Sequence, residues 1–356
     1  MHIAQIAPLT EAVPPKLYGG TERVVSYLTE ELVNMGHDVT LYASGDSQTS
    51  AELRTVCQRA LRLEAEKLSS PLAHHLNLIE IVVQDADEFD VVHFHLDYLP
   101  FSLIRRLGIP ALTTLHGRLD IPDLHPLFRE FDDMRLISIS DAQRAPMPWA
   151  NWLMTVHHGL PGNLHEATGV PGQYLAFLGR IAQEKRVDRA IEIARRARIP
   201  LRVAAKIDAA DREYYEREIE HLLSGPDVEF VGEICEEQKT EFLGNAAALL
   251  FPIDWPEPFG LVMIEAMACG TPVIAFRGGS VAEIVDDGVT GFVVESIEEA
   301  VEAVRRIPEV DRDGCRRRFE QRFSARRMCE DYLVAYERRI WEQKRTHGRR
   351  GLTLTR

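Results

Sequence analysis

The chain has few cysteines for its 356 residues, and they form no recognisable pattern. Cys57, Cys235, Cys269, Cys315 and Cys329 lie far apart, are odd in number, and include no Cys-x-x-Cys pair. This spacing argues against a disulfide framework and against a structural zinc site, and it is typical of a protein in a reducing compartment. We therefore expect a cytoplasmic protein.

Long apolar runs are absent as well. No stretch approaches the roughly 18 uninterrupted apolar residues that a membrane helix needs, and the first residues lead straight into an apolar strand without the pattern of a signal peptide. Basic residues are outnumbered, with 41 Lys+Arg against 55 Asp+Glu and a formal net charge of −14. This balance disfavours a general nucleic-acid-binding protein.

The acidic charge is unevenly distributed along the chain. Residues 312–356 hold 14 Lys+Arg and 6 Asp+Glu, an excess of eight positive charges, so residues 1–311 carry −22. The basic segment reads as a long amphipathic helix. Attraction to an anionic membrane surface is one interpretation of it. Packing across domains is the favoured one, because the acidic remainder would oppose broad adhesion to a membrane.

Both halves of the chain alternate short apolar runs with stretches of helical periodicity. The runs predict strands near residues 2–8, 38–44, 90–95, 110–117, 135–140 and 152–159 in the first half, and near 174–180, 200–206, 227–233, 248–254, 272–277 and 291–295 in the second. Six strands per half, separated by helices, indicate two doubly wound, Rossmann-like α/β domains. The segment 158–172 is dense in Gly and Pro and reads as the linker. We expect domains at residues 1–163 and 164–325.

The ligands of open parallel sheets bind at the carboxyl ends of the strands, so a site is expected in the cleft between the two domains. Tyr18-Gly19-Gly20-Thr21 lies between the first strand and the first long helix. Its glycines permit close approach of a ligand, and free amides at a helix N-terminus attract anions. The spacing is not Gly-x-Gly-x-x-Gly, and a plain strand-to-helix loop is an equal alternative.

Two cations follow the first strand of the second half. Arg180 stands at the end of that strand, and Lys185 comes five residues later. An arginine fork and a lysine point charge at one strand end can clamp a diphosphate, although a solvated basic turn would look the same.

The most specific segment is EPFGLVMIEAMACGTPVIA at residues 257–275. Flanking prolines place Glu257 in a loop. Gly260 and Leu261 open the following helix, whose amides suit a phosphate, and Glu265 lies about one and a half turns inside it. Each carboxylate can bind a pair of sugar hydroxyls; surface and helix-face glutamates are the alternative.

Glu257 and Glu265 form a Glu-x7-Glu motif, and with it the chain resembles the retaining glycosyltransferases of family 4, which have the two-domain GT-B fold. The matching motifs run through most of the chain, from Gly19-Gly20 and Leu115-His116-Gly117 to Asp287-Gly-Val-Thr-Gly-Phe292. The resemblance implies two Rossmann-like domains facing a central cleft, with a C-terminal helix near 326–345 that crosses back onto the first domain.

The resemblance also implies roles for single residues. Arg180 and Lys185 would neutralise the donor diphosphate, Glu265 would hold the ribose hydroxyls, and Glu257 would contact the transferred sugar. His116 would lie close to that sugar. The remaining donor contacts would come from the backbone at Gly19, Gly20, Phe259, Gly260 and Leu261, with Val231 and Gly232 facing the nucleobase.

The expected activity is transfer of a hexosyl group from a nucleotide-diphosphate sugar, with UDP-hexose ahead of GDP-mannose. We expect no metal, no other cofactor, and an acceptor hydroxyl on a sugar, glycolipid or small molecule. A nucleotide-sugar epimerase or hydrolase on the same fold, and a non-catalytic regulator that binds sugar nucleotides, are alternatives. His93, His95 and Asp97 could suggest a metal site, but they lack a convincing further ligand, and hydrogen-bonded histidines are favoured.

Overall fold

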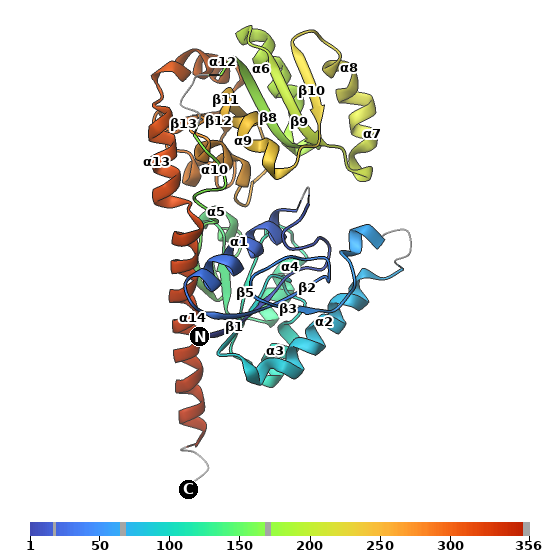
Figure 1. Ribbon diagram of the computed structural model, residues 1–356, viewed down its shortest axis with the longest axis vertical. Helices are drawn as coiled ribbons and strands as arrows, with labels where there is room; N and C mark the ends of the chain where they lie inside the picture. Colours follow the sequence, from blue (N-terminus) through green and yellow to red (C-terminus); the bar gives the residue numbers. More distant parts are fainter. Residues whose placement is uncertain (17–18, 65–68, 168–171, 352–356) are drawn as a thin grey trace.

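The computed structural model describes residues 1–16, 19–64, 69–167 and 172–351. Tyr18 of the glycine loop, residues 65–68 and residues 168–171 of the expected linker lie outside these ranges. The described chain forms two domains, one stacked above the other in Figure 1.

The first domain is built on a seven-stranded parallel sheet in the order β3-β2-β1-β4-β5-β6-β7. Its strands are β1 (His2–Ile6), β2 (Asp38–Ala43), β3 (Glu52–Thr55), β4 (Val91–Phe94), β5 (Ala111–Thr114), β6 (Leu136–Ser138) and β7 (Trp152–Thr155). Its helices are α1 (Gly20–Asn34), α2 (Pro71–Asp85), α3 (Phe101–Leu107), α4 (Leu124–Glu130) and α5 (Asp141–Arg144), with short 3₁₀ turns at Leu61–Glu64 and Ala86–Glu88.

The prediction of six strands in this half was wrong by one. The additional strand, β3, pairs with β2 at the edge of the sheet and has the sequence Glu-Leu-Arg-Thr, with no residue fully buried. An edge strand is exposed to solvent along one side, so its residues need not be apolar. A search for apolar runs therefore does not detect β3.

The second domain has a six-stranded parallel sheet in the order β10-β9-β8-β11-β12-β13. Its strands are β8 (Tyr174–Arg180), β9 (Leu201–Lys206), β10 (Val228–Gly232), β11 (Ala246–Phe251), β12 (Val273–Phe276) and β13 (Gly291–Val294). Its helices are α6 (Val187–Ala197), α7 (Arg212–Tyr214), α8 (Glu220–Leu223), α9 (Glu236–Gly244), α10 (Leu261–Ala268), α11 (Val281–Ile284), α12 (Ile297–Arg306) and α13 (Arg312–Arg322), with 3₁₀ turns at Gln183–Lys185, Ala209–Asp211 and Ile307–Glu309 and a π turn at Tyr215–Ile219. The predicted fold class, two doubly wound Rossmann-like domains, is confirmed.

The last helix, α14 (Ala325–Gly351), leaves the second domain and runs along one side of the first, next to α1 and β4 (Figure 1). Its Tyr332 and Tyr336 are fully buried there. Arg338 donates to the carbonyl oxygen of Leu153 (3.1 Å), and Arg339 donates to that of Ala111 (2.9 Å). Part of the charge of the basic tail is therefore directed at backbone carbonyl oxygens of the first domain.

The two connections between the domains meet each other. The backbone of Leu160 donates to Phe323 (2.9 Å) and accepts from Ala325 (2.7 Å), so the linker pairs with the junction of α13 and α14. At Gly159 a Cβ would lie 2.3 Å from the carbonyl oxygen of Ser324, which makes glycine necessary for this close approach.

Candidate functional site

A cleft of about 670 Å³ lies between the domains, at the carboxyl ends of strands from both sheets. Its lining includes six cationic side chains, from Arg23, Arg118, Arg180, Lys185, Lys206 and Lys239, and three acidic ones, from Glu233, Glu257 and Glu265. Cationic side chains thus outnumber carboxylates two to one in the lining of the cleft, in a chain with a net charge of −14. Such a cleft attracts anionic ligands.

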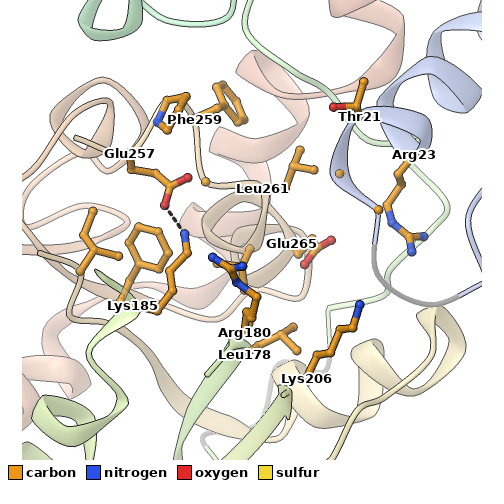
Figure 2. Close-up of a pocket in the computed structure, with 18 of the residues that line it drawn as sticks. Thr21, Arg23, Leu178, Arg180, Lys185, Lys206, Glu257, Phe259, Leu261 and Glu265 are labelled. Carbon is orange, nitrogen blue, oxygen red and sulfur yellow. Dashed lines mark hydrogen bonds and ion pairs between the residues drawn. The ribbon is translucent and has the colours of Figure 1, made fainter. Parts of the chain in front are cut away.

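Two of these cations stand at the topological switch point of the second sheet. β8 and β11 are neighbours there although two strands separate them in the sequence. Arg180 is the last residue of β8, and Lys185 ends the 3₁₀ turn that follows. Figure 2 shows Arg180 between Glu257 and Glu265, with Arg23 and Thr21 of α1 on the opposite side of the cleft.

Lys185 and Glu257 form an ion pair in this cleft (Figure 2). The indole Nε1 of Trp255 donates to the same carboxylate oxygen at 2.9 Å, and the Lys185 Nζ lies 4.6 Å from the centre of the Trp255 ring. Glu257 is 7% exposed. Its carboxylate is therefore held from two sides.

The loop that carries Glu257 is fastened by its neighbours. The backbone of Ser280 donates to the Glu257 carbonyl (2.9 Å), and its hydroxyl donates to the Phe259 carbonyl (2.8 Å). From the other domain, the Ser140 hydroxyl donates to the Pro258 carbonyl at 2.7 Å. The position of Glu257 thus depends on both domains.

Two helix N-termini face each other across the cleft. Gly260 precedes α10 in a left-handed conformation, with φ at 82°, and Leu261 begins the helix. Gly20 begins α1, and a Cβ placed on it would lie 3.8 Å from Leu261 Cδ1. First-turn amides and the positive ends of both helix dipoles therefore converge on one region, as in anion-binding sites.

The guanidinium of Arg180 contacts three carboxylates, a feature that the sequence does not predict. It lies 2.6 Å from Glu184, 3.2 Å from Asp211 and 3.8 Å from Asp208. These partners restrict the guanidinium and relieve its repulsion by the neighbouring cations.

Glu265 is 4% exposed and accepts a hydrogen bond from Lys239 Nζ at 2.7 Å. Lys239 also lies 3.0 Å from Glu236, which forms an ion pair with Arg23 of the first domain. Burial alone would raise the pKa of Glu236, but contacts with His165, Lys239 and Arg23 outweigh it and lower the pKa to about 2. The sequence does not predict this set of partners, since nothing local in it indicates that Arg23 meets α9.

His116 follows β5 and lines the cleft. Its Nε2 lies 2.9 Å from His95 Nδ1, and its ring stacks on His158 with centroids 5.3 Å apart. Burial lowers the pKa of His116 to about 3, so its imidazole is uncharged. His158, to which the sequence assigns no role, also lines the cleft, and its ring packs against that of Phe259 with centroids 4.8 Å apart.

Glu283 also joins the two domains, although the sequence gives it no role. Its carboxylate accepts from the backbone amides of Asp141 (2.8 Å) and Ala142 (2.7 Å) at the start of α5. His157 Nε2 lies 3.2 Å from it. Burial would raise the pKa of Glu283, but these hydrogen bonds lower it overall.

Val231 and Gly232 are not among the residues that line the cleft, whereas Glu233 and Ile234 are. β10 ends at Gly232, whose φ of 77° turns the chain so that the next residues reach the cleft. The other ten residues to which the family resemblance gives a catalytic or donor-binding role all line the cleft.

His93 of β4 and His95, which follows that strand, both have hydrogen-bond partners. His93 lies 2.8 Å from the Tyr336 hydroxyl and 2.7 Å from that of Thr114. Within the parts of the chain that the structure describes, no group of three or more His, Cys, Asp or Glu side chains could hold a metal ion.

Two family models match the chain, one described as Glycosyltransferase Family 4 over residues 18–176 and the other as Glycosyl transferases group 1 over residues 166–324. The chain belongs to the family 4 glycosyltransferases. It is therefore an enzyme, a hexosyltransferase, and not the non-catalytic regulator considered from the sequence.

Several proteins are similar to this glycosyltransferase over nearly the whole length of both chains. The alpha-maltose-1-phosphate synthase of Mycolicibacterium smegmatis is 25% identical over 94% of this chain and 99% of its own length. Among solved structures, AviGT4, a glycosyltransferase involved in avilamycin A biosynthesis, has 24% identity and a TM-score of 0.72, covering 95% of this chain and 98% of its own. Anabaena HepE, solved in complex with UDP-glucose, has 18% identity and a TM-score of 0.70, covering 95% and 99%.

As to membranes, the described helices of this glycosyltransferase include none with both the length and the apolar character needed to span a bilayer.

Proposed function

We propose that this glycosyltransferase moves a hexosyl group from a nucleotide-diphosphate sugar to an acceptor hydroxyl, with retention of the anomeric configuration. The observation that carries the proposal is the meeting of Arg180, Lys185 and the N-terminus of α10 at one switch point, between Glu257 and Glu265. A diphosphate that joins a sugar to a ribose would fit this arrangement, with the cations and amides at the diphosphate and one carboxylate at each of the two sugars.

The diphosphate would occupy the positive part of the cleft. Lys185, Arg180 and the first amides of α10 supply charge and donors where negative charge develops as the nucleotide leaves. Groups fixed in advance at such a position stabilise the transition state without reorganising. The amides at Gly19 and Gly20 would approach from the first domain.

The two glutamates would hold the parts on either side of the diphosphate. Glu265, kept in place by Lys239, would accept from the ribose hydroxyls. Glu257, kept in place by Lys185 and Trp255, would accept from hydroxyls of the transferred hexose, with His116 close by. Positioning is the favoured role of Glu257, rather than nucleophilic attack.

Retention is what the resemblance to the family 4 enzymes implies, and same-face substitution needs no glycosidase-like pair of carboxylates. The acceptor would attack the face that the nucleotide leaves, and the departing phosphate would take the acceptor's proton. No metal is needed in this scheme, because side-chain cations and amides stabilise the leaving group.

UDP-hexose is the donor we favour, with GDP-mannose next. The likeness to Anabaena HepE, which binds UDP-glucose, supports a uridine donor. The base would lie near the end of β10, where Glu233 and Ile234 line the cleft.

Product analysis tests the proposal. The enzyme is incubated with UDP-α-glucose or GDP-α-mannose and a panel of sugars, glycolipids and small alcohols, and anomeric protons are followed by NMR. An α-linked glycoside is the expected product. A β-linked product contradicts retention, an isomeric donor without glycoside indicates an epimerase, and free hexose alone indicates a hydrolase.

A further inference from the structure

A buried chain of hydrogen bonds connects α14 to His116 in the cleft. Gln5 of β1 donates through Nε2 to the hydroxyl of Tyr336 (2.8 Å), and its Oε1 lies 3.0 Å from His95 Nε2. His95 Nδ1 in turn lies 2.9 Å from His116 Nε2. Gln5 and Tyr336 are fully buried, and His95 is 3% exposed.

The chemistry of these atoms fixes where the protons sit. Burial lowers the pKa of His95 and of His116, so each ring is neutral and carries one N–H. His95 must donate from Nε2, because the amide oxygen of Gln5 can only accept. Nδ1 of His95 then carries no proton and accepts a hydrogen bond. The donor of that hydrogen bond is Nε2 of His116, which must therefore be protonated.

This assignment leaves Nδ1 of His116 unprotonated. Among the described residues, that nitrogen is buried and has no hydrogen-bond partner. The stacked ring of His158 restricts the imidazole further. His116 therefore presents one defined tautomer and one defined ring orientation beside the cleft.

The second branch of the network is consistent with the same proton order. The Tyr336 hydroxyl accepts from Gln5 and can therefore donate to His93 Nδ1 at 2.8 Å. His93 Nε2 then donates to Thr114 Oγ1 at 2.7 Å, and this oxygen lies 3.0 Å from the Tyr332 hydroxyl.

We propose that Gln5, His95 and Tyr336 are positioning residues for glycosyl transfer, which hold His116 as its Nε2–H tautomer so that its ring is oriented toward the donor sugar. Through them, the C-terminal helix contributes to a step in the cleft although it does not line it. The inference rests on the proposed function, since it assumes that His116 lies beside the transferred hexose.

A merely structural role makes a different prediction. Buried polar groups generally find partners, and a network that only satisfies them would affect folding but not the tautomer or the rate. Donor affinity should come mainly from the diphosphate and ribose contacts, so loss of positioning should lower kcat and leave the donor KM nearly unchanged.

Two substitutions at one position separate these roles. His95→Asn keeps an acceptor oxygen at the place of Nδ1, whereas His95→Leu removes it. We expect His95→Leu to lower kcat at least about tenfold, with donor KM within about twofold of wild type, and His95→Asn to restore most of the loss. Tyr336→Phe, which removes one hydroxyl, should lower kcat in the same way if His95→Leu does not fold. Tyr332→Phe on the outer branch is the matched control and should retain kcat.

The tautomer is measured directly by NMR on ¹⁵N-histidine-labelled protein, without substrate. We expect His116 to be protonated at Nε2 in wild type and in His95→Asn, and to become a mixture in His95→Leu and Tyr336→Phe. An unchanged tautomer in both of these variants, or an unchanged kcat, overturns the positioning role. A wild-type protein that turns over no nucleotide sugar overturns the proposed function instead, and the NMR comparison still decides the tautomer.

Discussion

Arg23 in the first turn of α1 and Glu236 at the start of α9 form an ion pair across the interdomain cleft. Their side chains are only 6% and 16% exposed. Glu236 also forms an ion pair with Lys239, and Lys239 forms a second one with Glu265. A row of charges of alternating sign therefore connects the first domain to the carboxylate proposed to hold the ribose.

Arg23→Ala should weaken both the fold and donor binding. Removing a buried charged partner costs about 1.5–3 kcal/mol of unfolding free energy, and Lys239 would be drawn from Glu265 toward the less neutralised Glu236. Urea unfolding and donor titration measure the two effects. Arg326→Ala is the control, since Arg326 is 57% exposed and its ion pair with Glu330 should contribute below about 1 kcal/mol. Donor affinity unchanged in Arg23→Ala would contradict the connection.

Lys185→Ala should lower kcat/KM for the donor by about 10²–10³ fold, the usual cost of removing one fixed group that stabilises developing negative charge. Steady-state kinetics with the preferred nucleotide sugar checks this. Arg189→Ala is the matched control, because Arg189 pairs with Asp254 and is not among the residues lining the cleft. Equal activity in the two variants would contradict the proposed role of Lys185 at the diphosphate.

Gly260→Ala should weaken donor binding as well as stability. Its φ is 82°, which strains the backbone of any residue with a Cβ, and an added Cβ would lie 2.6 Å from Met263 Cε, 3.2 Å from Phe251 Cζ and 3.3 Å from Glu257 Cγ, so that side chains around the start of α10 must move. Gly288→Ala is the control for backbone strain, because φ there is 75° and nothing lies within 4 Å. Backbone strain should cost about 1–2 kcal/mol of unfolding free energy in each variant, measured in melting experiments, and the contacts of the new methyl group add to this cost only in Gly260→Ala. Only Gly260→Ala should reduce donor affinity, and equal affinities would exclude a role for the α10 amides.

Acid should destabilise the protein below neutral pH. Burial lowers the pKa of His93, His95, His116 and His158, so these rings stay neutral in the native state. The unfolded chain takes up protons near pH 6.5, and the stability present above that pH is lost as pH falls, down to about pH 3 for His116.

Each of these histidines should contribute a slope of up to about 1.4 kcal/mol per pH unit. Urea unfolding between pH 7.5 and 5.5 measures the slope, and His95→Asn should reduce it by the share of one histidine. A free energy of unfolding that stays constant over this range would show that the four rings are not buried as described.

The sequence predicts the fold well because most strands are buried on both faces and read as apolar runs. β3 was not predicted because Glu52 and Arg54 lie at an exposed sheet edge, where burial imposes no pattern. Glu257 precedes helix α10 and Glu265 lies within it, so the two carboxylates are close together in the sequence and their spacing indicates a site.

The partners of those carboxylates cannot be predicted in the same way. Lys239 and Arg23 reach Glu265 and Glu236 only through the packing of α9 and α1, and His158 reaches His116 only through the folding of the first domain. Val231 and Gly232 match a family pattern, but the turn at Gly232 delivers Glu233 and Ile234 to the cleft instead. Local spacing thus identifies the candidate donor contacts, and long-range folding determines what orients them.

Donor binding tests the central claim most directly, because it needs no acceptor. Thermal unfolding is followed with UDP-, GDP- and ADP-hexoses in wild type, Lys185→Ala and Glu265→Ala, since a ligand that binds the native state raises Tm. The account predicts a rise for wild type, largest with UDP-hexose, that both substitutions abolish. No rise with any nucleotide sugar, or the same rise in both variants, would contradict it.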